Sequence, residues 1–182
     1  MKKYIHYCWF GDKPFPKLGQ KCLESWKKNL PDYEIIKWSE ENVNLNECPF
    51  IKEAYENKKW AFVADYARAK ALKEYGGIYF DTDMEVIKNI DNLFKCNTFL
   101  GIEDTGYVAV GVWYEKEPNG ILPTKLLNVY QSMEKFDIDN ISEAGKRIIP
   151  VLVKDNAKTS KMHLDKNNKL WVLTTGTNTQ KE

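Results

Sequence analysis

Apolar side chains recur with two different periods along the first half of the chain. Over residues 17–29 they are spaced three or four apart, which places them on one face of a helix. Residues 3–9 and 33–38 are short runs rich in Tyr, Ile and Trp, bounded by glycine and proline, a composition typical of β-strands. The pattern therefore predicts strands separated by amphipathic helices.

The strongest helix is predicted over residues 60–75, because this stretch is rich in alanine and contains no breaker. It should end at Gly76-Gly77, since a glycine just past a helix can adopt the left-handed conformation. A brief buried strand over 78–80 then runs directly into Asp81-Thr82-Asp83, and the chain is expected to stay extended over 84–87.

Shorter patterns predict the remaining elements. These are a short helix over 50–57, a turn or helical turn over 89–94, strands over 98–102 and 107–114, and helices over 121–133 and 141–153. Alternating strands and helices indicate an α/β fold, a Rossmann-type, mostly parallel sheet flanked by helices. We expect a single domain over 1–155, followed by a polar C-terminal extension, 156–182, with one apolar island at 170–173.

Composition narrows the classes of protein that remain. Lys and Arg number 27 against 26 Asp and Glu, for a net charge of +1, whereas a nucleic-acid-binding domain is usually strongly basic. No apolar run reaches the roughly 18–20 residues that span a bilayer, and the N-terminal apolar stretch is too short for a signal-peptide core. We therefore expect a cytoplasmic protein that does not bind nucleic acid, with its four cysteines reduced.

Two carboxylates follow the buried strand at 78–80, where ligands of parallel α/β sheets bind. In an extended chain Asp81 and Asp83 would project to the same side and repel each other. A divalent cation removes that repulsion, and carboxylate oxygens suit Mg²⁺ or Mn²⁺, which keep open positions for phosphate oxygens. The pattern is compatible with a metal and diphosphate site; the alternative is a polar turn after a strand.

Two further features precede this strand. Asp65 and Arg68 share one face of the predicted helix, and their apolar surroundings suggest a charged pair that sugar hydroxyls would bind, although a surface ion pair is the alternative. Trp9 ends the first predicted strand, where its ring is placed either to stack on a base or to pack in the core.

Three segments resemble a known family of enzymes. They are IHYCWFGDKPFP, SWKKNLPDYEIIKW and KKWAFVADYARAKALKEYGGIYFDTDMEVIKNID. Together they are similar to the glycosyltransferases with a sugar-binding DXD region, typified by bacterial capsular-polysaccharide transferases, fungal initiating mannosyltransferases and, more distantly, clostridial glucosylating toxins. The resemblance covers about residues 3–103 and implies a GT-A fold.

The resemblance also implies roles for individual residues. Asp83 corresponds to the carboxylate that binds Mn²⁺ or Mg²⁺ on the donor diphosphate, and Asp81 to the one that reaches the ribose and donor sugar. Asp65 and Arg68 correspond to the pair that holds sugar hydroxyls and phosphate. The remaining donor contacts implied are base stacking by Trp9, a ribose contact by Tyr79, and space for the ligand beside Gly76 and Gly77. The catalytic residues would be Asp81, Asp83 and Arg68.

The resemblance implies metal-dependent transfer of a sugar from a nucleotide-sugar donor, with retention of the anomeric configuration. The expected donor is a UDP-sugar. The acceptor would be a saccharide or a lipid-linked glycan of surface or capsular polysaccharide synthesis. A lipid-linked acceptor would bring the protein to the inner face of the membrane as a peripheral protein.

Two other functions remain open. The His and Ser-Trp pattern that family members carry downstream is missing from 156–182, so a truncated nucleotide-sugar-binding or assembly domain without turnover is one alternative. A phosphohydrolase of the haloacid-dehalogenase type is the other, disfavoured because Glu85 stands where its motif has Thr or Val. His6 is expected to be a satisfied core histidine, and His163 a loop residue rather than a late metal ligand.

Overall fold

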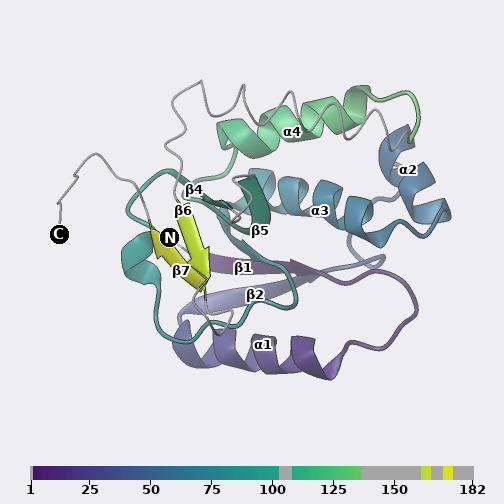
Figure 1. Cartoon of the computed structure of the whole chain (residues 1–182). Coiled ribbons are helices and arrows are strands. Elements are labelled where there is room, and N and C mark those ends of the chain that lie inside the picture. Colours follow the sequence, from purple (N-terminus) through teal and green to yellow (C-terminus); the bar gives the residue numbers. More distant parts are fainter. Residues whose placement is uncertain (1, 103–107, 137–160, 165–169, 174–182) are drawn as a thin grey trace.

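The computed structural model describes residues 2–102, 108–136, 161–164 and 170–173 (Figure 1). The elements are β1 (Lys3–Cys8), α1 (Lys17–Asn29), β2 (Tyr33–Trp38), α2 (Pro49–Glu56), α3 (Trp60–Tyr75), β3 (Gly77–Phe80), the 3₁₀ turn η1 (Asp91–Leu93), β4 (Thr98–Ile102), β5 (Val108–Glu115), α4 (Ile121–Ser132), β6 (Lys161–Leu164) and β7 (Leu170–Leu173).

Most of these bounds agree with the sequence pattern. Elements α1, β2, α3 and β4 have the predicted bounds, and β1, α2, β3, β5 and α4 differ from theirs by one residue at one or both ends. The 3₁₀ turn η1 is shorter than the predicted turn over 89–94, and β6 was not predicted as a strand. The helix predicted over 141–153 lies outside the described residues. The apolar island at 170–173 is a strand, β7, which pairs antiparallel with β6.

The main sheet has the strand order β2-β1-β3-β5-β4. Strand β1 pairs parallel with both β2 and β3, whereas β5 runs antiparallel to β3 and β4. Four strands therefore point the same way and β5 alone is reversed, which confirms the predicted mostly parallel α/β sheet. Because β5 is reversed, its first residues lie beside the carboxyl end of β3.

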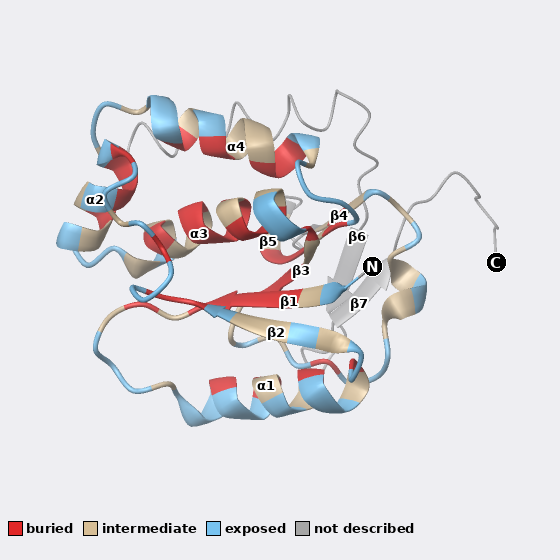
Figure 2. Cartoon of the chain, turned by 180° about the vertical axis from the view of Figure 1, so that it is seen from behind, coloured by how far each residue is buried: buried red, intermediate tan, exposed pale blue. Residues whose placement is uncertain are grey.

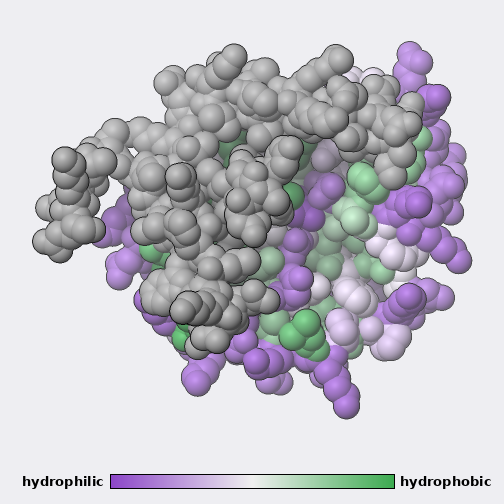
Figure 3. All heavy atoms as spheres, viewed as in Figure 1, coloured by the Kyte–Doolittle hydropathy of each residue, from purple (hydrophilic) through white to green (hydrophobic). Residues whose placement is uncertain are grey.

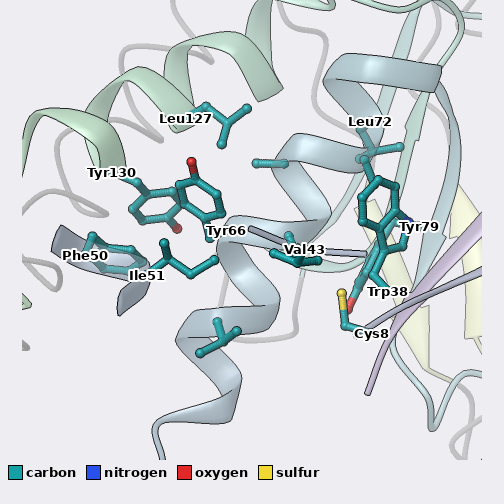
Figure 4. Close-up of a cluster of buried hydrophobic side chains, with 14 of the residues drawn as sticks. Cys8, Trp38, Val43, Phe50, Ile51, Tyr66, Leu72, Tyr79, Leu127 and Tyr130 are labelled. Carbon is teal, nitrogen blue, oxygen red and sulfur yellow. The ribbon is translucent and has the colours of Figure 1, made fainter. Parts of the chain in front are cut away.

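Helices cover both faces of this sheet (Figure 1). On one face α3 packs with α2 and α4, and the rings of Phe50 and Tyr130 stack there with centroids 4.5 Å apart (Figure 4). On the other face α1 buries Trp26 against Phe80, with ring centroids 5.2 Å apart. The side chains buried between these layers belong mainly to β1, β3 and the inner side of α3 (Figure 2).

Helix α1 also holds the chain that follows the Asp81–Asp83 segment. The Trp26 indole N–H donates to the Met84 carbonyl at 2.6 Å, and the Asn29 side-chain amide donates to the Val86 carbonyl at 2.6 Å. The Val86 N–H donates in turn to Ser25 Oγ at 2.9 Å. These bonds satisfy main-chain groups of a segment that belongs to no strand.

His6 is fully buried on β1, as the sequence predicted for a core histidine. The Trp38 indole N–H donates to His6 Nδ1 at 3.2 Å, so the ring proton sits on Nε2, which donates to the Gly76 carbonyl at 2.8 Å. Burial lowers the pKa of His6 to about 4 despite the bond to Gly76. The residue is therefore a neutral structural group.

On the face shown in Figure 3, hydrophilic residues gather around the rim of the described part, with less polar and apolar residues between them. Large apolar side chains that are exposed lie on separate segments: Leu18, Tyr75, Ile87 and Ile121. All four cysteines are free thiols, as predicted. Within the described ranges, no helix is both long and apolar enough to cross a bilayer.

Candidate functional site

A cavity of about 320 Å³ opens where β1 and β3 end, beside the first half of α3. It is lined by Cys8 and Phe10 from the end of β1, by Trp60, Ala61, Ala64 and Arg68 from α3, and by Tyr79, Asp81, Thr82 and Asp83 from β3 and the turn after it. Its position beyond the carboxyl ends of parallel strands is where ligands of such folds bind.

Arg68 is the charged centre of this cavity, with only 7% of its side chain exposed. Its Nη2 lies 3.0 Å from Asp65 Oδ1 and 3.4 Å from Asp81 Oδ1, and its Nη1 donates to the Val110 carbonyl at 2.8 Å. The guanidinium also stacks over the Tyr79 ring, 4.6 Å from its centroid. Two carboxylates thus balance a buried cation, and the predicted Asp65–Arg68 pair is formed.

One hydrogen-bond donor of Arg68 has no acceptor among the described residues. Its Nε is buried and has no hydrogen-bond partner among the described residues, although it belongs to a residue that lines the cavity. A buried donor without an acceptor costs free energy, so a ligand that supplies an oxygen here would be favoured.

Asp81 is held by both its main chain and its side chain. Its N–H donates to the Gly111 carbonyl at 2.8 Å, and its Oδ1 accepts a bond from the Tyr79 hydroxyl at 3.0 Å. Burial raises the pKa of Tyr79 well above its ordinary value, so the hydroxyl stays protonated and acts as the donor. Tyr79 therefore orients Asp81, a role the sequence did not predict.

The chain turns after Asp81 instead of staying extended. The Met84 N–H donates to the Asp81 carbonyl at 3.0 Å and closes a turn, and residues 84–87 form no strand. The prediction that the chain stays extended past Asp81 is therefore wrong. The turn nevertheless places Asp81, Thr82 and Asp83 together in the wall of the cavity.

The pKa of the Asp65 carboxyl depends on its burial and on the charges of Arg68 and Asp81. Burial raises the pKa of its carboxyl, the Arg68 guanidinium opposes that rise, and the nearby Asp81 carboxylate adds to it. The carboxyl keeps 28% of its side chain exposed, so it faces the solvent side of the pair. Asp65 does not line the cavity itself but borders it through its contact with Arg68, and its binding of sugar hydroxyls stays a prediction.

The aromatic wall of the cavity is not the predicted one. Trp9 does not line the cavity; its ring packs edge-on against Phe15 with centroids 5.2 Å apart, and its indole N–H donates to the Lys13 carbonyl at 2.9 Å. Its role in base stacking stays a prediction. Trp60 and Phe10 line the cavity instead.

Sequence reasoning missed Trp60, but a signal for it existed. Trp60, Ala64 and Arg68 are spaced by four residues and so share one face of α3, and all three line the cavity. The Trp60 ring also lies close above Gly11, where an added Cβ would be 3.0 Å from it.

Gly76 and Gly77 do not leave space for a ligand, and that prediction is wrong. Their φ angles are +64° and +92°, and a Cβ on Gly77 would lie 2.5 Å from the Tyr4 carbonyl oxygen. A Cβ on Gly76 would lie 3.1 Å from the Glu115 carbonyl oxygen. The protein's own backbone fills the space, and Gly77 begins β3 at the end opposite Asp81.

The carboxylates of Asp81 and Asp83 suit a hard divalent cation. Within the described residues Asp81 Oδ2 accepts no hydrogen bond, and no group of three or more His, Cys, Asp or Glu side chains gathers as a complete metal site. Two carboxylates at an open cavity match the way Mg²⁺ is bound, with the remaining positions left to water and ligand phosphates. His163 lies on β6, in register with Trp171 of β7, and not in the predicted loop.

Comparisons with known proteins bear on this geometry. Residues 16–100 match the model of the glycosyltransferase sugar-binding region containing DXD motif. The solved structure of the PaToxG glycosyltransferase is similar with a TM-score of 0.60 at 18% identity, over 85% of this chain and 70% of that one. A transferase solved as a double cysteine-to-serine mutant is similar with a TM-score of 0.57 at 11% identity, over 82% of this chain and 86% of that one. No curated protein matches the sequence.

The family match spans α3, β3 and the turn that carries the two carboxylates. It covers somewhat less than half of the chain and agrees with the resemblance that the motifs indicate. The two solved structures, at their low identities, confirm the α/β fold.

Proposed function

We propose that the protein is a metal-dependent glycosyltransferase that takes a sugar from a nucleotide-sugar donor, a UDP-sugar in the first instance. The main observation behind the proposal is the cavity at the end of β3, which is lined by the carboxylates of Asp81 and Asp83 and by the buried Arg68 with its unpaired Nε. This arrangement combines groups for a cation, a diphosphate and sugar hydroxyls in one place.

Departure of a nucleoside diphosphate concentrates negative charge on its outer phosphate. Arg68 offers a fixed positive charge and a free donor beside that position, and such preorganised groups stabilise the transition state more than the ground state. Asp83, with Asp81 beside it, would hold Mn²⁺ or Mg²⁺, which when bound neutralises the leaving diphosphate. Tyr79 keeps the Asp81 carboxylate oriented through its hydroxyl.

Other residues in the cavity and at its border would bind the rest of the donor. Asp65 is half-buried and accepts hydrogen bonds, so it would orient the sugar through its hydroxyls. Trp60 and Phe10 offer aromatic surface for a flat group such as the base. By resemblance to the capsular and mannosyltransferase groups, the proposal extends to a saccharide or lipid-linked acceptor, to retention at the anomeric carbon, and to surface-polysaccharide synthesis at the cytoplasmic face of the membrane.

Release of UDP from a panel of UDP-sugars tests this function. We expect release that depends on Mn²⁺ or Mg²⁺, is abolished by a chelator, and falls at least a hundredfold in Asp83→Ala. Glu85→Ala is the matched control, because Glu85 is a nearby carboxylate that pairs with Lys21 on the surface and does not line the cavity. Full activity in Asp83→Ala would contradict the metal assignment. Thermal stabilisation by UDP and Mn²⁺ without any release would instead favour a binding domain without turnover.

A further inference from the structure

The backbone of β5 contacts two residues that line the cavity, Arg68 and Asp81, at a place where the pairing of β5 with β4 is irregular. Leu100 pairs with Trp113, but the next residue, Gly101, pairs with Ala109. Residues 110–112 therefore have no one-to-one partners on β4, which is the arrangement of a β-bulge. Bulges redirect main-chain groups of a strand, and this one lies beside the cavity.

Two successive carbonyls of the bulge hold the charged groups of the site. The Val110 carbonyl accepts a bond from Arg68 Nη1 at 2.8 Å, and the Gly111 carbonyl accepts one from the Asp81 N–H at 2.8 Å. The second bond continues the β3–β5 ladder, in which Phe80 pairs with Val112. The same two residues of β5 thus fix the guanidinium and the main chain of the first carboxylate.

The Asp81 carboxylate also occupies the space where a side chain at position 111 would be. A Cβ on Gly111 would lie 2.8 Å from Asp81 Oδ2 and 3.1 Å from Met84 Cε. The Met84 methyl can move aside, because it ends a flexible side chain. The carboxylate is less free, because Oδ1 accepts a bond from Tyr79 at 3.0 Å and lies 3.4 Å from Arg68 Nη2.

Backbone conformation is not the reason for glycine at this position. The glycines with positive φ are Gly11, Gly76 and Gly77 among the described residues, and Gly111 is not one of them. Alanine can therefore adopt the backbone of residue 111 without strain. Its only cost is the contact with the carboxylate and with Met84.

We infer that Gly111 is a positioning residue for Asp81: the absence of a side chain at this position keeps Oδ2 of the carboxylate directed so that a divalent cation and a nucleoside diphosphate can reach it. The identity of the ligands that Asp81 binds rests on the proposed function. The contact between Gly111 and Asp81 is independent of that proposal. In Gly111→Ala the carboxylate has to rotate away, which breaks its contacts with Tyr79 and Arg68.

A mutant cycle without any ligand tests the contact. The proteins compared are the wild type, Gly111→Ala, Asp81→Ala and the double variant, and the readout is the thermal unfolding midpoint. Gly111→Ala is expected to lower the midpoint by several degrees in the wild-type background and by much less in the Asp81→Ala background, because the opposing carboxylate is then gone. An equal drop in both backgrounds would overturn the inference.

Binding of Mn²⁺ in the presence of UDP tests whether Gly111 keeps Asp81 ready to bind these ligands. Free Mn²⁺ is measured by its electron paramagnetic resonance signal, at a temperature below the unfolding midpoint of every variant. Gly111→Ala should bind Mn²⁺ and UDP at least tenfold more weakly than the wild type. The matched control is Gly120→Ala, where the new Cβ would collide with the Glu115 carboxylate, away from the cavity; its affinity should equal that of the wild type. Unchanged affinity in Gly111→Ala would overturn the inference. A wild type that binds neither ligand would defeat the proposed function, while the mutant cycle would still decide whether Gly111 positions Asp81.

Discussion

Two acidic side chains, Asp81 and Glu115, lie at opposite ends of the β3–β5 pair, and each abuts a glycine. Asp81 lies beside a cation, Arg68, and opens to a cavity with 37% of its side chain exposed. Glu115 is 2% exposed and has two neutral partners, the hydroxyl of Thr98 and the indole N–H of Trp113, both at 2.8 Å.

The difference shows how surroundings decide the use of a carboxylate. Burial raises the pKa of Glu115 to about 7, and its two hydrogen bonds only partly oppose that rise. Such a group is a structural one that is neutral over much of the acidic range. At the other end, the Asp81 carboxylate lies beside the charge of Arg68 and faces an open cavity, where a ligand can reach it.

Removal of the cation is the strongest way to break this contrast. Arg68→Met leaves Asp65 and Asp81 close together without a positive partner, so the free energy of unfolding should fall by about 3 kcal/mol or more. Binding of UDP with Mn²⁺ should be lost as well. Urea unfolding and a UDP titration measure both effects.

The control for this variant is Lys70→Met on the same helix, whose ammonium pairs with Glu47 and Glu74 at a more accessible site. It should cost less than about 1 kcal/mol and leave binding intact. Equal losses in the two variants would show that Arg68 is only another ion pair of α3.

Glu115→Gln tests the other end of the pair. The wild-type carboxyl has a native pKa of about 7 against an ordinary value of 4.5, so its contribution to stability is complete below pH 4.5 and is lost as the pH rises to about 7. Relative to the wild type, the variant should gain about 3 kcal/mol over that interval. The contribution of His6 to the free energy of unfolding has the opposite pH dependence, but it is the same in the wild type and in Glu115→Gln and cancels in the comparison. Urea unfolding between pH 4.5 and 7.5 measures the difference, and parallel curves would refute the raised pKa.

Trp60→Ala sharpens the comparison, since the Trp60 ring forms part of the wall of the open cavity beside Asp81. Loss of the Trp60 ring should weaken UDP binding about tenfold, because stacking of a base on an aromatic side chain contributes about 1–3 kcal/mol. Trp9→Ala should have a smaller effect, since Trp9 packs on Phe15 outside the cavity. Calorimetric titration with UDP measures both, and a larger loss in Trp9→Ala would restore the stacking role that the resemblance implies.

Sequence periodicity was sufficient for the elements whose structure is set locally. The apolar spacing of residues 17–29 and the alanine-rich run at 60–75 are each compatible with a helix alone. Both helices form with the predicted bounds. The strand–helix order also placed Asp81 at the edge of the sheet where ligands bind, because parallel strands end at the same edge. The pair of Asp65 and Arg68 followed from their spacing on one face of the helix.

The rest of the site depends on packing between distant segments. Gly111 and Val110 join the site because β5 is reversed in the sheet and carries a bulge, and neither property is visible in the spacing of residues. The turn at Asp81 is set by a main-chain bond to Met84. The left-handed Gly77 packs against Tyr4, seventy-three positions earlier in the chain, so its purpose could not be inferred from its neighbours in sequence.

The hold of α1 on the chain after the carboxylates has a practical consequence for protein engineering. The Met84 and Val86 main-chain groups depend on the side chains of Ser25, Trp26 and Asn29 for their hydrogen bonds. A chimera that exchanges residues 81–87 alone for the corresponding segment of a relative would separate this segment from these partners. Transplanting the loop together with the inward-facing residues of the first helix is therefore the unit of exchange that preserves a working geometry.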